Sequence, residues 1–257
     1  MSKLKRRVAM SLMAHPDDCE LLAYGTLALL RQAGWEVHIV TMTPGDCGSM
    51  DLGPIEIAQT RRAEGAKAAK VIGATYTCLE SRDLYITYDE VTLRRAFEVT
   101  RHIAPTLVVT HSLTDYMMDH ECTARIARNV SFGYAVPNAC PGAVPKGATL
   151  PYLYYADPIE GTDVYGNRVA PGTYVDIGKS IFTKARALKL HASQREWLMK
   201  HHGMDQYVKS MNDWAGLRGK EVGVKFAEGF RQHKGHPYPH DCILLKELGD
   251  VVKNPSP

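Results

Sequence analysis

Two short segments of the chain concentrate side chains that can bind a metal ion. The first, "AHPDDCE", occupies residues 14–20, and the second, "THSLTDYMMDHECT", occupies residues 110–123. In the first segment His15 and Asp18 are three residues apart across a proline, whose fixed φ favours a tight turn. Such a turn can direct an imidazole and a carboxylate at one point, so we expect His15 and Asp18 to act together.

A second histidine can complete this set. His120 stands in the second segment, near the start of an expected helix. Two histidines and one carboxylate, with an open position for water, form a common catalytic zinc arrangement. Zinc in such a site lowers the pKa of a bound water towards about 7. Asp17, beside that water without being a ligand, is then a candidate general base.

The two adjacent aspartates also have a structural interpretation. A carboxylate that follows a strand often caps the next helix, where it accepts hydrogen bonds from free backbone amides and meets the positive end of the helix dipole. Taken alone, "HPDD" does not distinguish capping from catalysis. The second His and Asp cluster, at another strand end, favours catalysis.

Strand-like and helix-like patterns alternate through the first half of the chain and would position both segments. Strands are expected over residues 8–13, 36–42, 76–79 and 106–111, and helices over 20–33, 55–72, 88–102 and 119–134. Repeated units of this kind favour a parallel sheet with helices on both faces. Ligands bind such sheets beyond the carboxyl ends of the strands, which is where both metal-type segments fall.

The second half of the chain is less regular. Residues 137–172 are rich in proline and glycine, and we expect them to wall the pocket or to meet another subunit. Further strands are expected over 152–157 and 173–177, and further helices over 179–202 and 205–216. No segment resembles a long linker, so the sequence predicts a single α/β domain over residues 1–257.

Composition excludes several classes of function. The formal net charge of +3 gives no signature of nucleic-acid binding or of a polybasic membrane surface, and no apolar run approaches a membrane span. The six cysteines form no CxxC pair, and the glycines of residues 43–54 do not form the GxGxxG pattern of a dinucleotide site. We therefore expect a cytoplasmic protein without nucleic-acid or membrane partners.

The two metal-type segments together resemble the PIG-L/LmbE-like family of zinc-dependent N-deacetylases. The resemblance rests on "AHPDDCE" followed by "DYMMDH", and it extends, in family order, to "RRAEGAKAAKVIGA" (61–74), "ESRDL" (80–84), "ALKLHASQ" (187–194) and "KFAEGFR" (225–231). It implies a Rossmann-like, mostly parallel sheet with C-terminal elaborations. It also implies removal of an N-acyl group, typically acetyl, from an amino sugar or a similar polar molecule, by a protein that is commonly a homo-oligomer.

The resemblance assigns roles to individual residues. By matching motif positions it implies that His15, Asp18 and His120 bind Zn²⁺, with Fe²⁺, Co²⁺ or Mn²⁺ as alternatives, and that Asp17 is the general base. It places Arg61 and Asp83 at the substrate, and it gives Asp119, beside the second histidine, the role of orienting neighbouring groups.

One position departs from the family pattern. Many members have a histidine where this chain has Met117, and methionine cannot deliver a proton to a leaving amine. Three replacements are open: Asp17 can act in both proton transfers, the hydroxyl of Tyr116 can contact the substrate oxyanion, or a histidine of the C-terminal segment can fold into the cleft. That segment holds His233, His236 and His240.

The same departure keeps a second class of reaction open. A lyase or hydratase can use the same metal site, because a fold does not determine a reaction. A binding protein without catalysis is the third alternative, and it conflicts with the intact set of His15, Asp17, Asp18 and His120.

Overall fold

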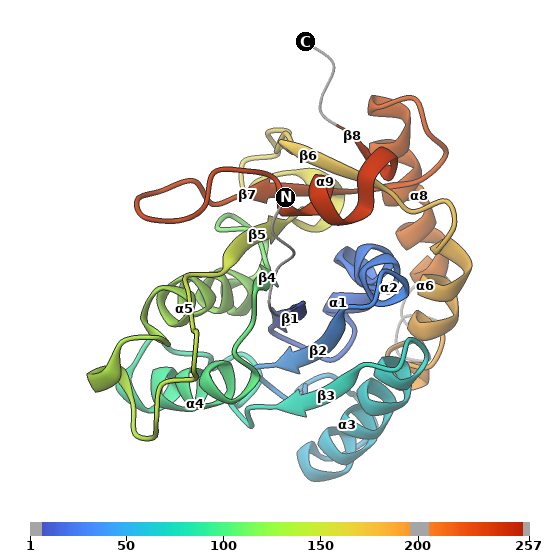
Figure 1. Cartoon of the computed structure of the whole chain (residues 1–257). Helices are drawn as coiled ribbons and strands as arrows, with labels where there is room; N and C mark the ends of the chain where they lie inside the picture. The colour runs from blue at the N-terminus through green and yellow to red at the C-terminus, as the bar shows by residue number, and fades with distance from the viewer. Residues whose placement is uncertain (1–6, 196–205, 254–257) are drawn as a thin grey trace.

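The computed structural model describes residues 7–195 and 206–253, and in this part of the chain eight strands form one sheet (Figure 1). Their order is β3-β2-β1-β4-β5-β7-β6-β8. The strands are β1 (Val8–Met13), β2 (Glu36–Thr41), β3 (Thr75–Cys78), β4 (Leu107–Thr110), β5 (Tyr152–Ala156), β6 (Thr173–Asp176), β7 (Ala227–Gln232) and β8 (Val252–Lys253).

The first five strands are parallel, whereas the last three add an antiparallel edge. β1 pairs in parallel with β2 and β4, and β4 pairs in parallel with β5. β7 then runs antiparallel between β5 and β6. The predicted Rossmann-like, mostly parallel sheet is therefore confirmed, and the three antiparallel strands are the C-terminal elaboration.

Helices cover both faces of the sheet, as the alternating pattern predicted. Figure 1 shows α4 and α5 on one side of the strands and α1, α2 and α6 on the other. The helices are α1 (Asp18–Leu22), α2 (Tyr24–Gln32), α3 (Pro54–Lys70), α4 (Glu90–Ile103), α5 (Met118–Gly133), α6 (Ile181–Leu188), α8 (Gln206–Glu221) and α9 (Ile243–Leu248). Within the described residues, no helix is both long and apolar enough to cross a bilayer.

Strand β1 shows how the two cores form on either side of the sheet. Its residues alternate between faces, because successive side chains of a strand point in opposite directions. Ala9 and Met13 join the core under α1 and α2, while Met10 and Leu12 join the core under α4 and α5. All of β1 is buried, so the loop after it starts from a rigid position.

A buried ion pair ties the antiparallel edge to the first helices. Lys184 Nζ lies 2.5 Å from Glu228 Oε1, and both side chains are buried. Glu228 also accepts hydrogen bonds from the backbone amides of Gly25 (2.9 Å) and Thr26 (2.7 Å), at the N-terminus of α2. A carboxylate at this end of a helix is stabilised by the free amides and the dipole.

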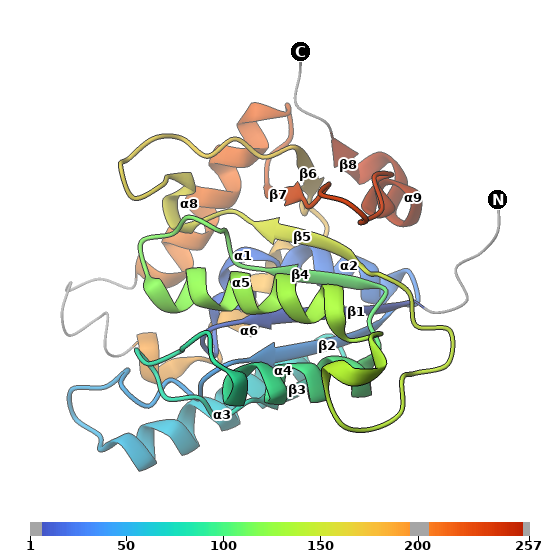
Figure 2. The same cartoon turned by 90° about the vertical axis from the view of Figure 1, so that its left-hand side faces the viewer.

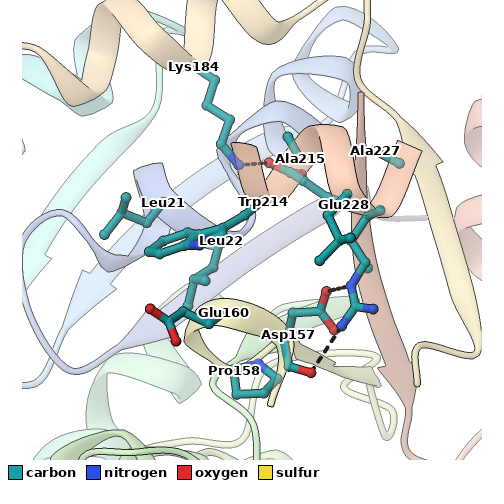
Figure 3. A pocket seen from close by; sticks show the side chains of 14 residues that line it. Leu21, Leu22, Asp157, Pro158, Glu160, Lys184, Trp214, Ala215, Ala227 and Glu228 are labelled. Atoms are coloured by element: carbon teal, nitrogen blue, oxygen red, sulfur yellow. Dashed lines mark hydrogen bonds and ion pairs between the residues drawn. The ribbon is translucent and has the colours of Figure 1, made fainter. Parts of the chain in front are cut away.

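Figure 3 shows this pair beside a small cavity of about 30 Å³, with Lys184 and Glu228 pointing toward each other and Asp157 at the other end. That volume holds about one or two water molecules and no substrate. The cavity is therefore too small to be a substrate site.

Two helix predictions were wrong in their extent. The helix expected over residues 20–33 breaks at Ala23 into α1 and α2, because Glu228 binds the new N-terminus. The helix expected over 179–202 is interrupted: α6 ends at Leu188, a turn that buries His191 follows, and helix resumes over residues 192–195, where Ser193 meets Glu64. The part of this prediction beyond residue 195 lies outside the described residues, as does the start of the helix predicted from 205.

Candidate metal centre and its pocket

The loop after β1 gives the adjacent residues Asp17 and Asp18 different hydrogen-bond partners. The amide of His15 donates to Asp18 Oδ2 at 2.7 Å, which closes the turn. Asp17 has a φ of +120°, a region that residues with a side chain rarely adopt, and such strain is often found at functional sites. Asp17 occupies the N-cap position of α1, but its side chain makes no capping hydrogen bond. The capping interpretation therefore has no support here.

His15, Asp18 and His120 converge on one point. The ligand atoms of the three residues lie within 4.8 Å of one another, and all three side chains are buried. His15 Nδ1 is 3.3 Å from Asp18 Oδ2, and His120 Nε2 is 3.5 Å from Asp18 Oδ1. Zinc–nitrogen and zinc–oxygen bonds near 2.1 Å place the ligands of a tetrahedral ion about 3.4 Å apart. The spacing therefore fits a divalent cation.

Each histidine has a carboxylate on its other ring nitrogen. Asp115 Oδ1 lies 2.9 Å from His120 Nδ1, while Asp83 Oδ1 lies 3.0 Å and Asp119 Oδ2 lies 3.4 Å from His15 Nε2. Carboxylates in this position fix the ring and the tautomer of a metal-binding histidine. His15 Nδ1 and His120 Nε2 are then the nitrogens that remain for a metal.

The charges of the cluster favour a cation. Burial acts to lower the pKa of His15, but hydrogen bonds to the surrounding carboxylates raise it well above its usual value. Burial likewise acts to lower the pKa of His120, and the charge of Asp18 outweighs it and raises the pKa. Both shifts report a negative potential, which a bound divalent ion would neutralise.

Asp17 faces a different set of partners. Arg61 Nη2 donates to Asp17 Oδ1 at 3.2 Å, and the hydroxyl of Tyr207, from α8, donates to Asp17 Oδ2. Burial raises the pKa of the Asp17 carboxyl, although Arg61 acts in the opposite direction. Asp17 is thus held beside the metal cluster by two donors without belonging to the candidate metal-binding groups.

Arg61 reaches Asp17 because glycines line its path. Arg61 Nη1 donates to the Gly45 carbonyl at 3.3 Å, and Nη2 donates to the Pro16 carbonyl at 2.9 Å. A Cβ atom at Gly45 or Gly48 would lie within 2.4 Å of Nη1, so a side chain at either position would displace the guanidinium. The glycines of the β2–α3 loop therefore serve the placement of Arg61.

A pocket of about 390 Å³ opens at this cluster. It lies beyond the carboxyl ends of the parallel strands, where the loops after β2, β4 and β5 gather at the left of Figure 2. Ile159, from the expected wall segment 137–172, lines it, together with Gln194, Tyr116 and Met117. The two histidines among its described lining residues are His15 and His120.

The structure places the remaining predicted residues in distinct ways. Arg61, Asp83 and Tyr116 line the pocket, although Asp83 uses one oxygen on His15 and the other on the Cys47 amide. Asp119 accepts from the Leu84 amide at 2.7 Å and so holds the loop before α4.

The C-terminal histidines give no support for a replacement acid. The ring of His233 is in contact with the rings of Tyr155 and Tyr238. His233, His236 and His240 are not among the described residues that line the pocket.

Three residues of the site were not predicted from the sequence. Tyr207 is more than 180 residues from Asp17, and nothing in its surrounding pattern distinguishes it from a core aromatic. Asp115 and His111 lie within the second metal-type segment, and the spacing of Asp115 to His120 was the signal available. His111 stacks on His120 with ring centroids 3.9 Å apart, and its Nε2 accepts from the Ala14 amide at 3.0 Å.

Comparison with known proteins agrees with this geometry. Residues 10–131 match the family model described as PIG-L, GlcNAc-PI de-N-acetylase, which spans both metal-type segments. The match to the PIG-L family covers this part of the chain, a little under half of its length. The His and Asp groups that could bind a metal lie within the matched residues.

Relatives of this chain differ in their reactions. The chain is 26% identical over 197 residues to 4-oxalmesaconate hydratase of Pseudomonas putida, covering 74% of each. It is 25% identical over 230 residues to diacetylchitobiose deacetylase of Thermococcus kodakarensis, covering 84% of this chain and 79% of the relative. The solved N,N'-diacetylchitobiose deacetylase of Pyrococcus horikoshii superposes with a TM-score of 0.75 at 23% identity, covering 91% and 88%, which shows the shared fold.

Proposed function

We propose that this protein is a zinc-dependent hydrolase that removes an N-acyl group, most simply acetyl, from an amino sugar or a related polar small molecule. The observation that carries the proposal is the convergence of His15, Asp18 and His120 beside Asp17. The description of the matching family model and the deacetylase relative support it.

The residues of the chain divide the chemistry between them. A divalent ion held by His15, Asp18 and His120 would polarise the acyl carbonyl and lower the pKa of a water towards about 7. Asp17 takes the proton of the attacking water, and its carboxylate is kept in place by Arg61. The carbon–nitrogen bond then breaks, and the acid that forms on Asp17 delivers its proton to the leaving nitrogen.

Met117 makes Asp17 responsible for both proton transfers. Met117 lines the pocket next to His120 and has no proton to give. The pocket lining holds a second proton donor in the hydroxyl of Tyr116, whose ring lies edge-on to His120 at 5.4 Å. In this proposal Tyr116 donates a hydrogen bond to the oxyanion of the tetrahedral intermediate.

A hydratase is the second candidate, and Met117 favours it. Addition of water to a carbon–carbon double bond needs no acid for a leaving amine, and one relative is a hydratase. The metal site and Asp17 would serve this reaction equally, since both reactions begin with the activation of water.

A paired assay separates the two reactions. The zinc-loaded protein is incubated with N-acetylglucosamine, N,N'-diacetylchitobiose and other N-acetyl sugars, and acetate is quantified. In parallel, unsaturated dicarboxylic acids are followed by loss of ultraviolet absorbance. Acetate release that disappears in Asp17→Asn supports the proposal. Absorbance loss without acetate release would favour the hydratase, and repetition with Fe²⁺, Co²⁺ and Mn²⁺ identifies the most active metal.

A further inference from the structure

The residues that line the pocket at the metal cluster are of two kinds. Arg61, Gln194 and Tyr207 are polar and accompany the candidate metal-binding residues. A second set is largely apolar, and we call it the apolar wall. It consists of Leu21, Leu84, Tyr116, Met117 and Ile159. A hydroxyl-rich sugar would find hydrogen-bonding partners in the first set and few in the second.

Neither core packing nor backbone preference explains why a leucine stands at position 84 of the apolar wall. Its side chain is 60% exposed, so it contributes little to a core. Its φ is +68°, the left-handed region that leucine adopts at a cost and that glycine or asparagine adopts readily. Strain of this kind that persists beside a reactive site indicates a functional constraint.

The strained backbone of Leu84 is held by the metal cluster itself. Asp119 Oδ2 accepts from the Leu84 amide at 2.7 Å and lies 3.4 Å from His15 Nε2. The same carboxylate therefore fixes a metal-binding histidine and the apolar side chain at the pocket mouth. This link sets the position of Leu84 relative to the reacting atoms.

Tyr116 and Met117 continue the apolar wall beside His120. Tyr116 is 70% exposed, and it lies in the loop that leads to α5. Met117, where many family members have a histidine, adds a flexible apolar side chain of the kind that adapts to varied partners. Leu84, Tyr116 and Met117 thus present apolar surface where the two loops meet the pocket.

We propose that the substrate carries an apolar or aromatic group next to the scissile bond and that this group lies on the apolar wall, with Leu84 as its principal contact. The inference rests on the proposed function for the metal site, and it narrows the substrate class from hydroxyl-rich sugars to molecules with one polar and one apolar side. Burial of each methylene on the wall strengthens binding about fourfold.

Hydroxamates test this without depending on turnover, because they bind a catalytic metal whatever reaction follows. Two series are titrated calorimetrically into the zinc-loaded full chain: acyl hydroxamates of increasing acyl length, and acetohydroxamates with increasing N-alkyl length. We expect the affinity in one series to rise several-fold per methylene over the first two or three methylenes.

Variants of Leu84 test whether the gain in hydroxamate affinity arises from contact with the apolar wall. Leu84→Asn keeps a residue that accepts the left-handed conformation and removes the apolar contact, so we expect it to abolish most of the gain while acetohydroxamate itself binds unchanged. Leu84→Met retains apolar contact and should retain most of the gain. Leu245→Asn, at an exposed leucine on α9 that does not line the pocket, is the control and should change nothing.

The outcomes separate this inference from the proposed function. Failure of every hydroxamate to bind would overturn the metal-site proposal and this one with it. Acetohydroxamate binding with no gain in either series would overturn the apolar subsite alone. A change of molecular mass in Leu84→Asn, with the hydroxamate series unaltered, would mean that the wall is a contact between copies of the chain, and the inference would be wrong.

Discussion

Removal of the carboxylate behind His120 tests whether the two histidines are built as metal ligands. Asp115 Oδ1 is the carboxylate oxygen on His120 Nδ1, at 2.9 Å, whereas His15 Nε2 has both Asp83 and Asp119. We therefore predict that Asp115→Ala weakens metal binding more than Asp83→Ala does, because Asp119 remains behind His15.

The expected loss of metal affinity follows from the typical effect of removing a carboxylate that is hydrogen-bonded to a metal-binding histidine. Removing one typically costs 10-fold to 100-fold in metal affinity, or about 1.4 to 2.7 kcal/mol. We expect Asp115→Ala to lose about 100-fold in metal affinity, since the buried Nδ1–H of His120 then loses the Asp115 carboxylate as its hydrogen-bond acceptor. Asp83→Ala should fall near tenfold or below, with Asp119 at 3.4 Å taking over the hydrogen bond.

Zinc affinity is measured by competition with a chromophoric chelator at fixed pH. Asp213→Ala is the control, because Asp213 is exposed, pairs with Lys209 on α8 and does not line the pocket. The unfolding temperature of each metal-free variant shows whether the fold is intact. The reasoning fails if Asp115→Ala binds zinc within twofold of the unmodified chain, or if Asp83→Ala loses more than Asp115→Ala.

Other perturbations have definite expected outcomes. Asp17→Asn should lower kcat by about 10² to 10⁴ while metal content stays at one ion per chain; an unchanged kcat would remove it as the base. Tyr207→Phe should lower kcat about tenfold, because Asp17 then keeps Arg61 as its remaining side-chain donor; a change confined to KM would contradict this role. Lys184→Met should reduce the unfolding free energy in urea by about 3 kcal/mol or more, since the buried Glu228 carboxylate then loses its ion-pair partner, and a loss below 1 kcal/mol would refute this. Chelation of the metal should lower the unfolding temperature, with about 4 kcal/mol of stability regained at a free-metal concentration 1,000 times Kd, and equal temperatures with and without chelator would disagree.

The parallel half of the fold was predictable because its signals are local. The strands before His15 and His111 are short apolar runs, and each is followed by a segment with helical periodicity. Of the antiparallel edge, β6 was expected as a strand over residues 173–177, whereas β7 and β8 were not predicted. β7, with the sequence "AEGFRQ", buries Glu228, and that burial depends on Lys184 and on the N-terminus of α2, both of which are distant in sequence.

In the candidate site, too, residues with a local sequence signal were predicted and a residue without one was missed. The groups His15, Asp18 and His120 are brought together as their motif spacing suggested, because the parallel sheet places both loops at one edge. Tyr207 was missed because its contact with Asp17 spans 190 residues and leaves no mark on the local pattern.

The neighbours of the metal cluster also have roles that residue type alone does not specify. Asp83 was expected at the substrate, yet one of its oxygens is directed at His15. Asp115, which had no predicted role, lies on His120. A carboxylate near a histidine can contact the substrate, the ring or the metal, and the three-dimensional distances are needed to distinguish these arrangements.

The most direct test of the account is X-ray absorption spectroscopy of the zinc-loaded protein, together with its metal stoichiometry. The account predicts one zinc per chain with nitrogen and oxygen ligands at about 2.0 to 2.2 Å, including two imidazoles, and loss of that ion in His120→Ala. A sulfur ligand at about 2.3 Å, or full zinc content in His120→Ala, would contradict it.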